Sequence, residues 1–330
     1  MGYIPRDERY ENMIYKRCGK YGIKLPEVSL GLWHNFGSLD SFDNMKELIF
    51  TAFDCGINHF DLANNYGPEP GRAEINLGRI LKEELSLYRD ELLISTKAGY
   101  EMWPGPYGNF GSKKHLIASL DQSLKRMGLE YVDIFYHHRM DTSTPIEETM
   151  HALNTIVKSG KALYVGLSNY DGIRMREASG ILRELRCPFV INQNRYSIFD
   201  RTIEENGLKD TALDLGKGLI VFSPLAQGLL TDRYISGIPK DSRAAKDGRF
   251  LNKESITEEK LEQIKQLNGL AAQRGQSLAQ MALAWVMKEG VTSVLIGASK
   301  PQQILENVDM LKNTSFLKEE LEFIDKVVKA

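Results

Sequence analysis

Four residues whose side chains can take part in proton transfer stand at or just after the ends of apolar segments: Asp61, Tyr66, Lys97 and His138. A free tyrosine has a pKa of about 10 and exchanges protons poorly near pH 7. An ammonium group close to the phenol favours phenolate, and a carboxylate can keep that ammonium charged and oriented. A histidine nearby can donate a second hydrogen bond to the same substrate oxygen. Together the four residues suggest a general acid for a carbonyl that becomes an alkoxide.

Each of the four residues also has a structural interpretation. Asp61 and Lys97 could form a structural ion pair, although buried ion pairs contribute little stability. Tyr66 could be an exposed loop residue, and His138 a hydrogen-bonded core histidine. His137 and His138 are adjacent on a predicted strand, so their side chains face opposite ways and cannot share one metal ion. No other His or Cys has the spacing of metal ligands, and we expect no metal site.

The elements that must position these residues recur as a repeating unit, in which a short aliphatic and β-branched run precedes a segment of helical periodicity. The pattern predicts strands at 28–33, 58–63, 92–97, 132–138, 162–168, 189–194, 219–224 and 293–297. It predicts helices at 41–55, 71–85, 113–127, 146–159, 171–185, 277–289 and 301–311.

Eight strands that alternate with helices favour an α/β fold, the (β/α)8 TIM barrel, over residues 1–330 as a single domain. The alternative, an open doubly wound sheet, usually has a Gly-rich turn after its first strand, and no GxGxxG occurs here. Residues 13–18 and 22–25 predict an N-terminal hairpin that closes the barrel floor. About 70 residues separate the seventh and eighth strands. This long loop contains a Gly/Pro/Arg-rich part and an extra helix at 257–274, and loops of this length usually carry function. A last helix is predicted at 317–329.

Composition excludes several classes of protein. The chain has 330 residues, 42% of them hydrophobic, and a formal net charge of −2. This charge gives no reason to expect nucleic-acid or membrane binding. No apolar run approaches the roughly 18 residues needed to span a bilayer, and the polar N-terminus does not resemble a secretory signal. Three distant cysteines fit reduced thiols, so we expect a cytoplasmic protein.

In such a barrel the active site lies at the C-terminal ends of the strands. The fifth strand ends in Ser168 and Asn169, and the sixth in Gln193. The seventh ends in Phe222-Ser223-Pro224, and the eighth in Gly297-Ala298-Ser299. Burying an unpaired polar group costs roughly 1–3 kcal/mol, so polar groups gathered at one mouth predict a functional site.

Several strings of the sequence resemble the aldo-keto reductases: GINHFDLANNYG, GLEYVDIFYHHRMD, YVGLSNY, NQNRYS, FSPLAQGLL and LIGASKPQQILEN. They extend from about residue 29 to residue 307. The residues Asp61, Tyr66, Lys97 and His138 match the family's Asp–Tyr–Lys–His tetrad in chain order. Within the family, MWPGPYG and GIPKDSRA are similar to the bacterial L-glyceraldehyde-3-phosphate reductases. The β subunits of voltage-gated potassium channels are also related.

The resemblance implies that NADPH binds in an extended conformation across the barrel mouth. The residues implied in its binding are Trp33, Asp61, Ser168, Asn169, Gln193, Phe222, Ser223, Pro224, Leu225, Ala226, Gln227, Gly228, Arg233, Arg243, Gly297, Ser299, Gln303, Glu306 and Asn307. Many members of the family have Arg where Gln303 stands, to hold the 2′-phosphate. Here Arg243 is the candidate for that role, followed by Lys300.

The resemblance therefore implies NADPH-dependent reduction of small aldehydes to alcohols, with Tyr66 as the general acid and L-glyceraldehyde 3-phosphate or methylglyoxal as substrate. Arg139 is a candidate partner for a substrate phosphate. The candidate substrate pocket consists of Trp33, Tyr66, Trp103, His138, Arg139 and Tyr196. The aromatic members of this set have an alternative interpretation, the packing of loops against the barrel.

Two other functions were weighed against the sequence. A cofactor-sensing subunit like the channel β subunits is the alternative, but those proteins have Asn where His138 stands, and a histidine favours a working enzyme. A phosphate-binding barrel lyase or isomerase would have a Gly-rich phosphate cradle near the eighth strand, which this sequence lacks. The small carbonyl substrate is the expected partner. Assembly into a homo-oligomer is suggested by analogy alone.

Overall fold

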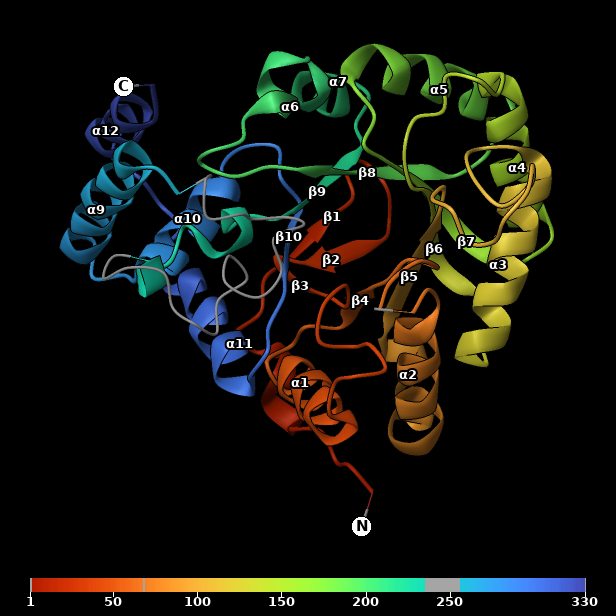
Figure 1. The fold of residues 1–330 in the computed structure, drawn as a ribbon, viewed down its shortest axis with the longest axis horizontal. Helices are drawn as coiled ribbons and strands as arrows, with labels where there is room; N and C mark the ends of the chain where they lie inside the picture. Colours follow the sequence, from red (N-terminus) through yellow and green to blue (C-terminus); the bar gives the residue numbers. More distant parts are fainter. Residues whose placement is uncertain (1, 68, 235–255, 330) are drawn as a thin grey trace.

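The computed structural model describes residues 2–67, 69–234 and 256–329. Eight strands of this part of the chain form a closed barrel in the order β10-β3-β4-β5-β6-β7-β8-β9, and all neighbouring pairs are parallel (Figure 1). The strands are β3 (Val28–Gly31), β4 (His59–Asp61), β5 (Leu93–Ala98), β6 (Val132–His137), β7 (Ala162–Ser168), β8 (Phe189–Arg195), β9 (Gly218–Phe222) and β10 (Ser293–Ile296). The predicted TIM barrel is confirmed.

Helices surround the barrel on its outer side (Figure 1). They are α1 (Phe42–Asp54), α2 (Arg72–Ile80), α3 (Lys113–Met127), α4 (Ile146–Lys158), α5 (Gly172–Glu184), α6 (Thr202–Glu205), α7 (Leu208–Asp214), α9 (Glu258–Gln273), α10 (Leu278–Val286), α11 (Pro301–Val308) and α12 (Lys318–Lys329). Several begin where the sequence supplies a capping side chain. Ser41, Ser112, Asp171, Thr257 and Ser277 each accept a hydrogen bond from the backbone amide three residues later, which satisfies a donor that the helix leaves unpaired.

The strand boundaries differ from the predicted ones by at most two residues, but the helical segments show larger differences. The pair α6 and α7 was not predicted, because Gly207 has a φ of +72° and divides the segment into two helices too short to show a clear period. The predicted helix 71–85 changes at Leu81–Leu85 to a π-helical turn. The predicted helix 301–311 becomes a 3₁₀ turn at Asp309–Lys312.

The predicted N-terminal hairpin is present as β1 (Tyr15–Arg17) and β2 (Lys24–Pro26), which pair antiparallel. Its turn lies against the chain that enters β9, where Lys20 N donates to Gly216 O at 3.1 Å. Cys18 and Leu25 are buried in one apolar cluster with residues of β6, β8, β9 and β10. The hairpin therefore closes the N-terminal end of the barrel.

The long segment between β9 and β10 contains α9 and α10, and α9 also contacts α12 (Figure 1). Arg243, the candidate partner for a cofactor phosphate, lies outside the described residues. Among the helices that are described, none combines the length and the apolar character that a transmembrane span requires.

The hairpin turn provides a test of this packing. Gly19 has a φ of +55°, and a Cβ atom there would lie 2.1 Å from Gly216 O. We expect Gly19→Ala to lower the free energy of unfolding by roughly 2–4 kcal/mol, from backbone strain and steric overlap together. Urea unfolding followed by circular dichroism measures the change.

The control for this variant is Gly22→Ala in the same hairpin, because a Cβ atom at Gly22 meets nothing within 4 Å. Equal stabilities of the Gly19 and Gly22 variants would contradict the close approach of the hairpin to the barrel floor.

Candidate active site

Strand register brings the polar strand ends together. Asp61 on β4 pairs with Ser95 on β5, and Lys97 lies two residues further along β5. Ser168 at the end of β7 pairs with Gln193 on β8. Residues two apart on a strand share a face, so Ser95 and Lys97 both face the barrel interior, where Asp61 contacts each of them.

Asp61 and Lys97 form an ion pair that is removed from solvent. Lys97 Nζ lies 2.5 Å from Asp61 Oδ2 and 2.6 Å from Leu62 O, and the two side chains are 2% and 0% exposed. The other carboxylate oxygen, Asp61 Oδ1, accepts from Ser95 Oγ at 2.6 Å and from Gln193 Nε2 at 3.1 Å. Burial lowers the pKa of Lys97, whereas the charge of Asp61 opposes that change. Since such a pair is a poor source of stability, its place at the mouth favours a functional role.

Tyr66 lies beside the ammonium group of this pair. Lys97 Nζ is 5.1 Å from the centre of the Tyr66 ring, and Tyr66 is partly exposed. Burial raises the pKa of Tyr66 well above its usual value near 10, and the charge of Asp61 raises it further. The net shift is opposite to the one expected from Lys97, because burial and the charge of Asp61 dominate the pKa of Tyr66. The phenol is protonated, which is the state a general acid needs.

His138 follows β6 and faces the same space. Its ring centre lies 6.0 Å from that of Tyr66 and 4.7 Å from that of Tyr100. Burial lowers the pKa of His138 well below 6.5, and the positive charges of Lys97 and Arg139 lower it further. A neutral imidazole carries one N–H donor. The structure thus brings all four tetrad candidates together and keeps the histidine uncharged.

The neighbouring His137 points away from the site, as predicted. Its Nδ1 lies 2.7 Å from the hydroxyl of Tyr170. Burial lowers the pKa of His137 to about 4. Within the described part of the chain, no group of three or more His, Cys, Asp or Glu residues is placed to hold a metal ion.

The amides predicted to hold a nicotinamide are linked to the tetrad. Asn169 Nδ2 donates to His138 O at 2.9 Å and to Ser168 Oγ at 3.2 Å. Gln193 reaches Asp61, as described above. Asn169 has a φ of +57°, a left-handed conformation that asparagine adopts more readily than most non-glycine residues.

The turn that follows β9 has an unusual backbone. Ser223, Ala226 and Gln227 have φ values of +55°, +47° and +60°, and Gln227 Nε2 donates to Ser223 Oγ at 3.1 Å. Three non-glycine residues in this strained region fit a segment shaped for a ligand. The same turn contains Phe222, which is partly exposed, and Pro224, Leu225 and Gly228.

The third group of cofactor candidates lies where β10 leads into α11. Gln303 Oε1 accepts hydrogen bonds from Ser299 N and Lys300 N, at 2.8 Å and 3.3 Å. The Gln303 side chain therefore caps the N-terminus of α11. A Cβ atom at Gly297 would meet open space. The other candidates lie further along the chain or in another turn: Glu306 is exposed on α11, Asn307 is buried there, and Arg233 is in the 3₁₀ turn Asp232–Tyr234.

Two of the predicted pocket walls take different positions. The ring centre of Trp33 lies 6.1 Å from that of Tyr66, at the mouth. Trp103 instead lies 5.1 Å from His115 of α3, which is the arrangement expected for a loop packed against the barrel.

The side chain of Tyr196 is buried and not exposed at the mouth. It is 0% exposed, its hydroxyl donates to Glu204 Oε1 at 2.5 Å, and its ring centre is 5.2 Å from that of Trp285. The structure therefore corrects the assignment of Tyr196 to the substrate pocket: it is a core residue, because its side chain packs against Trp285 of α10 and its hydroxyl bonds to Glu204 of α6.

Arg139 lies next to the tetrad and is held by its surroundings. Its guanidinium stands 4.3 Å from the ring centre of Tyr100 and 4.6 Å from that of Phe110. Arg139 Nε donates to Gly99 O at 3.0 Å, and Nη2 donates to Asn109 Oδ1 at 2.8 Å. A cation is therefore fixed beside His138.

Sequence reasoning missed three residues of this site. Tyr100 contacts both His138 and Arg139, and it follows β5, so the rule used for the other strand ends would have found it. His59 and Ser95 lie two residues before Asp61 and Lys97 and therefore share their inward face. Polar residues at alternate positions of two neighbouring strands were the available signal.

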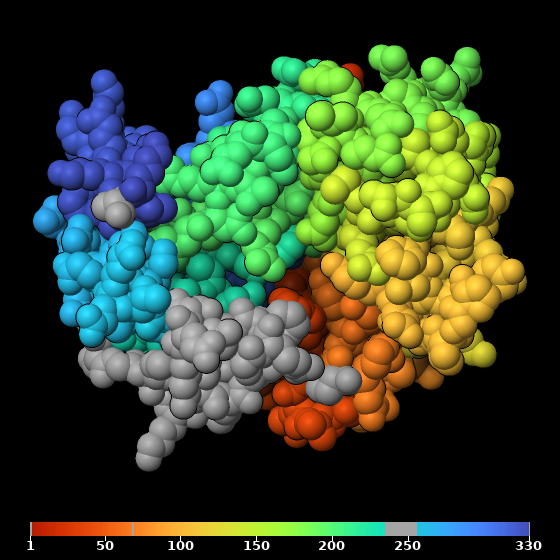
Figure 2. Space-filling model, turned by 45° about the horizontal axis from the view of Figure 1, so that its top comes forward, coloured from red at the N-terminus to blue at the C-terminus, as the bar shows by residue number. Residues whose placement is uncertain are grey.

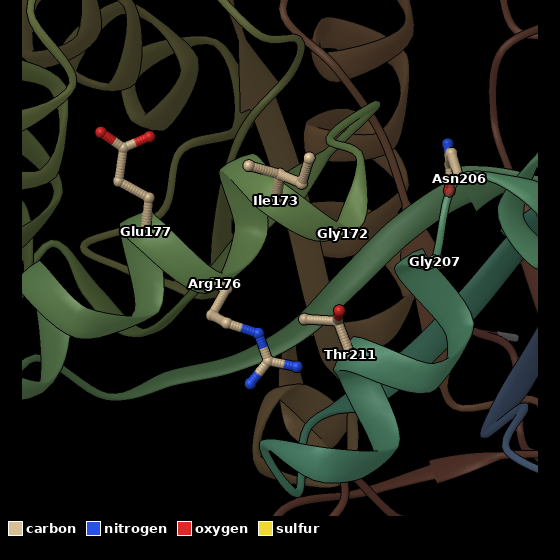
Figure 3. A pocket seen from close by; sticks show the side chains of 7 residues that line it. All are labelled: Gly172, Ile173, Arg176, Glu177, Asn206, Gly207 and Thr211. Carbon is tan, nitrogen blue, oxygen red and sulfur yellow. The ribbon is translucent and has the colours of Figure 1, made fainter.

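The surface is hollowed near the centre of one face, where red and orange N-terminal residues lie close to green residues from the middle of the chain (Figure 2). A separate hollow of about 390 Å³ lies between α5 and α7 on the outer side of the barrel (Figure 3). It is lined by Gly172, Ile173, Arg176, Glu177, Asn206, Gly207 and Thr211. None of the tetrad candidates is among its lining residues.

Comparison with known proteins finds relatives that match nearly the whole chain. The chain is 55% identical over 329 residues to the L-glyceraldehyde 3-phosphate reductase of Escherichia coli strain K12, with 98% of this chain and 95% of that protein covered. It is 35% identical over 321 residues to a probable voltage-gated potassium channel subunit beta of Oryza sativa subsp. japonica, with 96% and 95% covered. The profile of the Aldo/keto reductase family matches residues 27–329. The chain therefore belongs to the aldo/keto reductase family of oxidoreductases.

Proposed function

We propose that this chain reduces L-glyceraldehyde 3-phosphate with NADPH, and that it also reduces methylglyoxal. The observation that carries the proposal is a partly exposed phenol that lies beside a buried Lys97–Asp61 pair and a histidine. The 55% identical reductase of E. coli supports the choice of substrate. Three free cysteines, at positions 18, 55 and 187, suit a reducing compartment such as the cytoplasm.

NADPH is the proposed cofactor, and when bound it supplies the hydride that the carbonyl carbon accepts. The strained turn after β9 and the amides at the ends of β7 and β8 support this assignment. Ser168, Asn169 and Gln193 would hold the carboxamide, Phe222 would lie against the nicotinamide ring, and residues 223–228 with Arg233 would follow the pyrophosphate. Gly297, Ser299, Gln303, Glu306 and Asn307 would surround the adenosine, and Arg243 would meet its 2′-phosphate. Trp33 and Asp61 would border the nicotinamide end.

The residues of the chain then divide the proton chemistry among them. Tyr66 holds a proton on its hydroxyl and delivers it to the carbonyl oxygen. Lys97 stabilises the phenolate that remains, and Asp61 keeps Lys97 charged and in place. His138, because it is neutral, donates its one N–H to the carbonyl oxygen and orients it.

Arg139 is the proposed partner of the substrate phosphate. Arginine suits phosphate because its planar donors match the phosphate oxygens. Its fixed position between two aromatic rings, one residue from His138, supports this role. Methylglyoxal has no phosphate and needs no such partner.

The second candidate function is a regulatory subunit that senses the cofactor, which the 35% identical channel subunit supports. A neutral histidine beside Tyr66 favours the enzyme. Many rapid turnovers of NADPH per protein chain would exclude a sensor with slow chemistry.

The general acid can be tested by Tyr66→Phe. Removal of the transferable proton should lower kcat roughly 100- to 10,000-fold. The affinity for NADPH, measured by fluorescence titration, should stay nearly unchanged because the ring remains. Tyr88→Phe is the control, because Tyr88 is in the turn that precedes β5, at the opposite end of the barrel. Turnover retained by Tyr66→Phe would overturn the assignment.

The cofactor assignment can be tested by Phe222→Ala. Loss of an aromatic contact with the nicotinamide should raise the Kd for NADPH roughly 3- to 10-fold. Phe323→Ala on α12, where the phenylalanine is 39% exposed, is the control. An unchanged Kd in the Phe222 variant would show that the cofactor lies elsewhere.

The phosphate partner can be tested by Arg139→Met. Loss of a hydrogen bond between two charged groups should raise KM for L-glyceraldehyde 3-phosphate roughly 10- to 100-fold. Methylglyoxal reduction by the same variant is the internal control and should change far less. Equal losses with both substrates would assign Arg139 to the maintenance of the site and not to the phosphate.

A further inference from the structure

A continuous chain of hydrogen bonds runs through the barrel interior and ends on the proposed tetrad. Ser293 Oγ on β10 lies 2.7 Å from Ser29 Oγ on β3, which lies 2.9 Å from His59 Nδ1 on β4. His59 Nε2 lies 3.0 Å from Ser95 Oγ on β5, and Ser95 Oγ lies 2.6 Å from Asp61 Oδ1. All five side chains are buried.

The protonation of Asp61 and His59 decides the direction of these hydrogen bonds. Asp61 is paired with the ammonium of Lys97, and a carboxylate can only accept. Burial lowers the pKa of His59 to about 4, with Asp61 raising it and Lys97 lowering it. His59 is therefore neutral and carries one N–H.

Only one arrangement of protons then satisfies every contact. Ser95 spends its single O–H on Asp61, so its oxygen must accept from His59 Nε2–H. His59 Nδ1 is consequently unprotonated and accepts from the hydroxyl of Ser29. Ser29 has no proton left, so Ser293 donates to it. Every donor in the chain points towards the Asp61 carboxylate.

A barrel interior does not need this polar layer for its stability. Such layers are usually filled by branched aliphatic side chains, and replacement of both partners of a buried hydrogen bond by apolar groups can be nearly neutral. Ser95 and Gln193 are the two side chains that donate to Asp61 Oδ1, while Lys97 binds Oδ2. Loss of the Ser95 donor leaves Oδ1 with only the longer bond from Gln193 among these two, so the carboxylate is held less firmly and Lys97 can shift with it.

We propose that His59 and Ser95 are positioning residues of the reduction: with His59 as the Nε2–H tautomer, they fix the orientation of the Asp61 carboxylate and hence of Lys97. The kinetic part of this inference rests on the proposed function. The tautomer and the direction of the hydrogen bonds do not depend on it.

The tautomer can be measured by ¹⁵N nuclear magnetic resonance on the full chain labelled at its 6 histidines. We expect the His59 signal, assigned by its loss in His59→Gln, to show a protonated Nε2 and an unprotonated Nδ1 between about pH 5 and 8. A protonated Nδ1 with an unprotonated Nε2 would overturn the proposal, because His59 could then donate no hydrogen bond to Ser95 Oγ.

The positioning role can be measured by the kinetics of Ser95→Ala. We expect kcat for L-glyceraldehyde 3-phosphate or methylglyoxal to fall roughly 10- to 100-fold. Loss of a residue that orients a metal ligand has an effect of this size in metalloenzymes. KM and the Kd for NADPH should stay within about threefold of the wild type. His59→Leu should match Ser95→Ala. His59→Gln should recover most of the rate, because the Gln amide N–H can replace Nε2–H as the donor to Ser95.

Thr96→Val is the matched control on the same strand. Thr96 is buried, faces the opposite way from Ser95, and also donates to a buried carboxylate at 2.6 Å, that of Glu74. If hydroxyl loss acts only through stability, Ser95→Ala and Thr96→Val should lower Tm and activity alike, and this result would overturn the positioning role. If the wild type turns over none of the aldehydes, the proposed function fails, and the resonance measurement still decides the proton arrangement.

Discussion

The ion pair between Asp61 and Lys97 is the interaction on which the rest of the site depends. Two charges out of contact with water are held only where other groups share their hydrogen bonds, and here Leu62, Ser95 and Gln193 supply them. Burial and then the charge of Asp61 raise the pKa of Tyr66, so the phenol stays protonated beside the ammonium ion of the pair. Burial lowers the pKa of His138, and the nearby charge of Lys97 lowers it further, so the imidazole stays neutral.

Much of the fold and of the tetrad could be predicted because the C-terminal ends of all the barrel strands lie at the same end of the barrel. Asp61, Lys97 and His138 each stand at or next to the end of an apolar run, so a single sequence locates them. The electrostatics of the site and the burial of individual side chains depend on contacts between segments that are far apart in the sequence. The direction of the Tyr66 pKa shift follows from the burial of the phenol and then from the charge of Asp61, and the burial of Tyr196 follows from its packing against Trp285.

The polar residues of the barrel interior also show how far a single sequence can predict contacts. Alternate polar positions on two strands mark His59 and Ser95 in the sequence, but their hydrogen bonds depend on four strands that lie side by side. Their side chains meet because β10, β3, β4 and β5 are neighbours in the closed sheet. Hydrogen bonds thus link Asp61 of the proposed tetrad to buried polar residues of the barrel interior.

The hairpin at the floor has a consequence for these buried polar residues. Cys18 and Leu25 seal the barrel from below, and Ser293, where the chain of hydroxyl and imidazole groups begins, is itself removed from solvent. Among the described residues, the array is therefore buried at the floor, and its donors point towards Asp61 near the open side. Under the proposed function, the proton that Tyr66 delivers would be replaced from that open side.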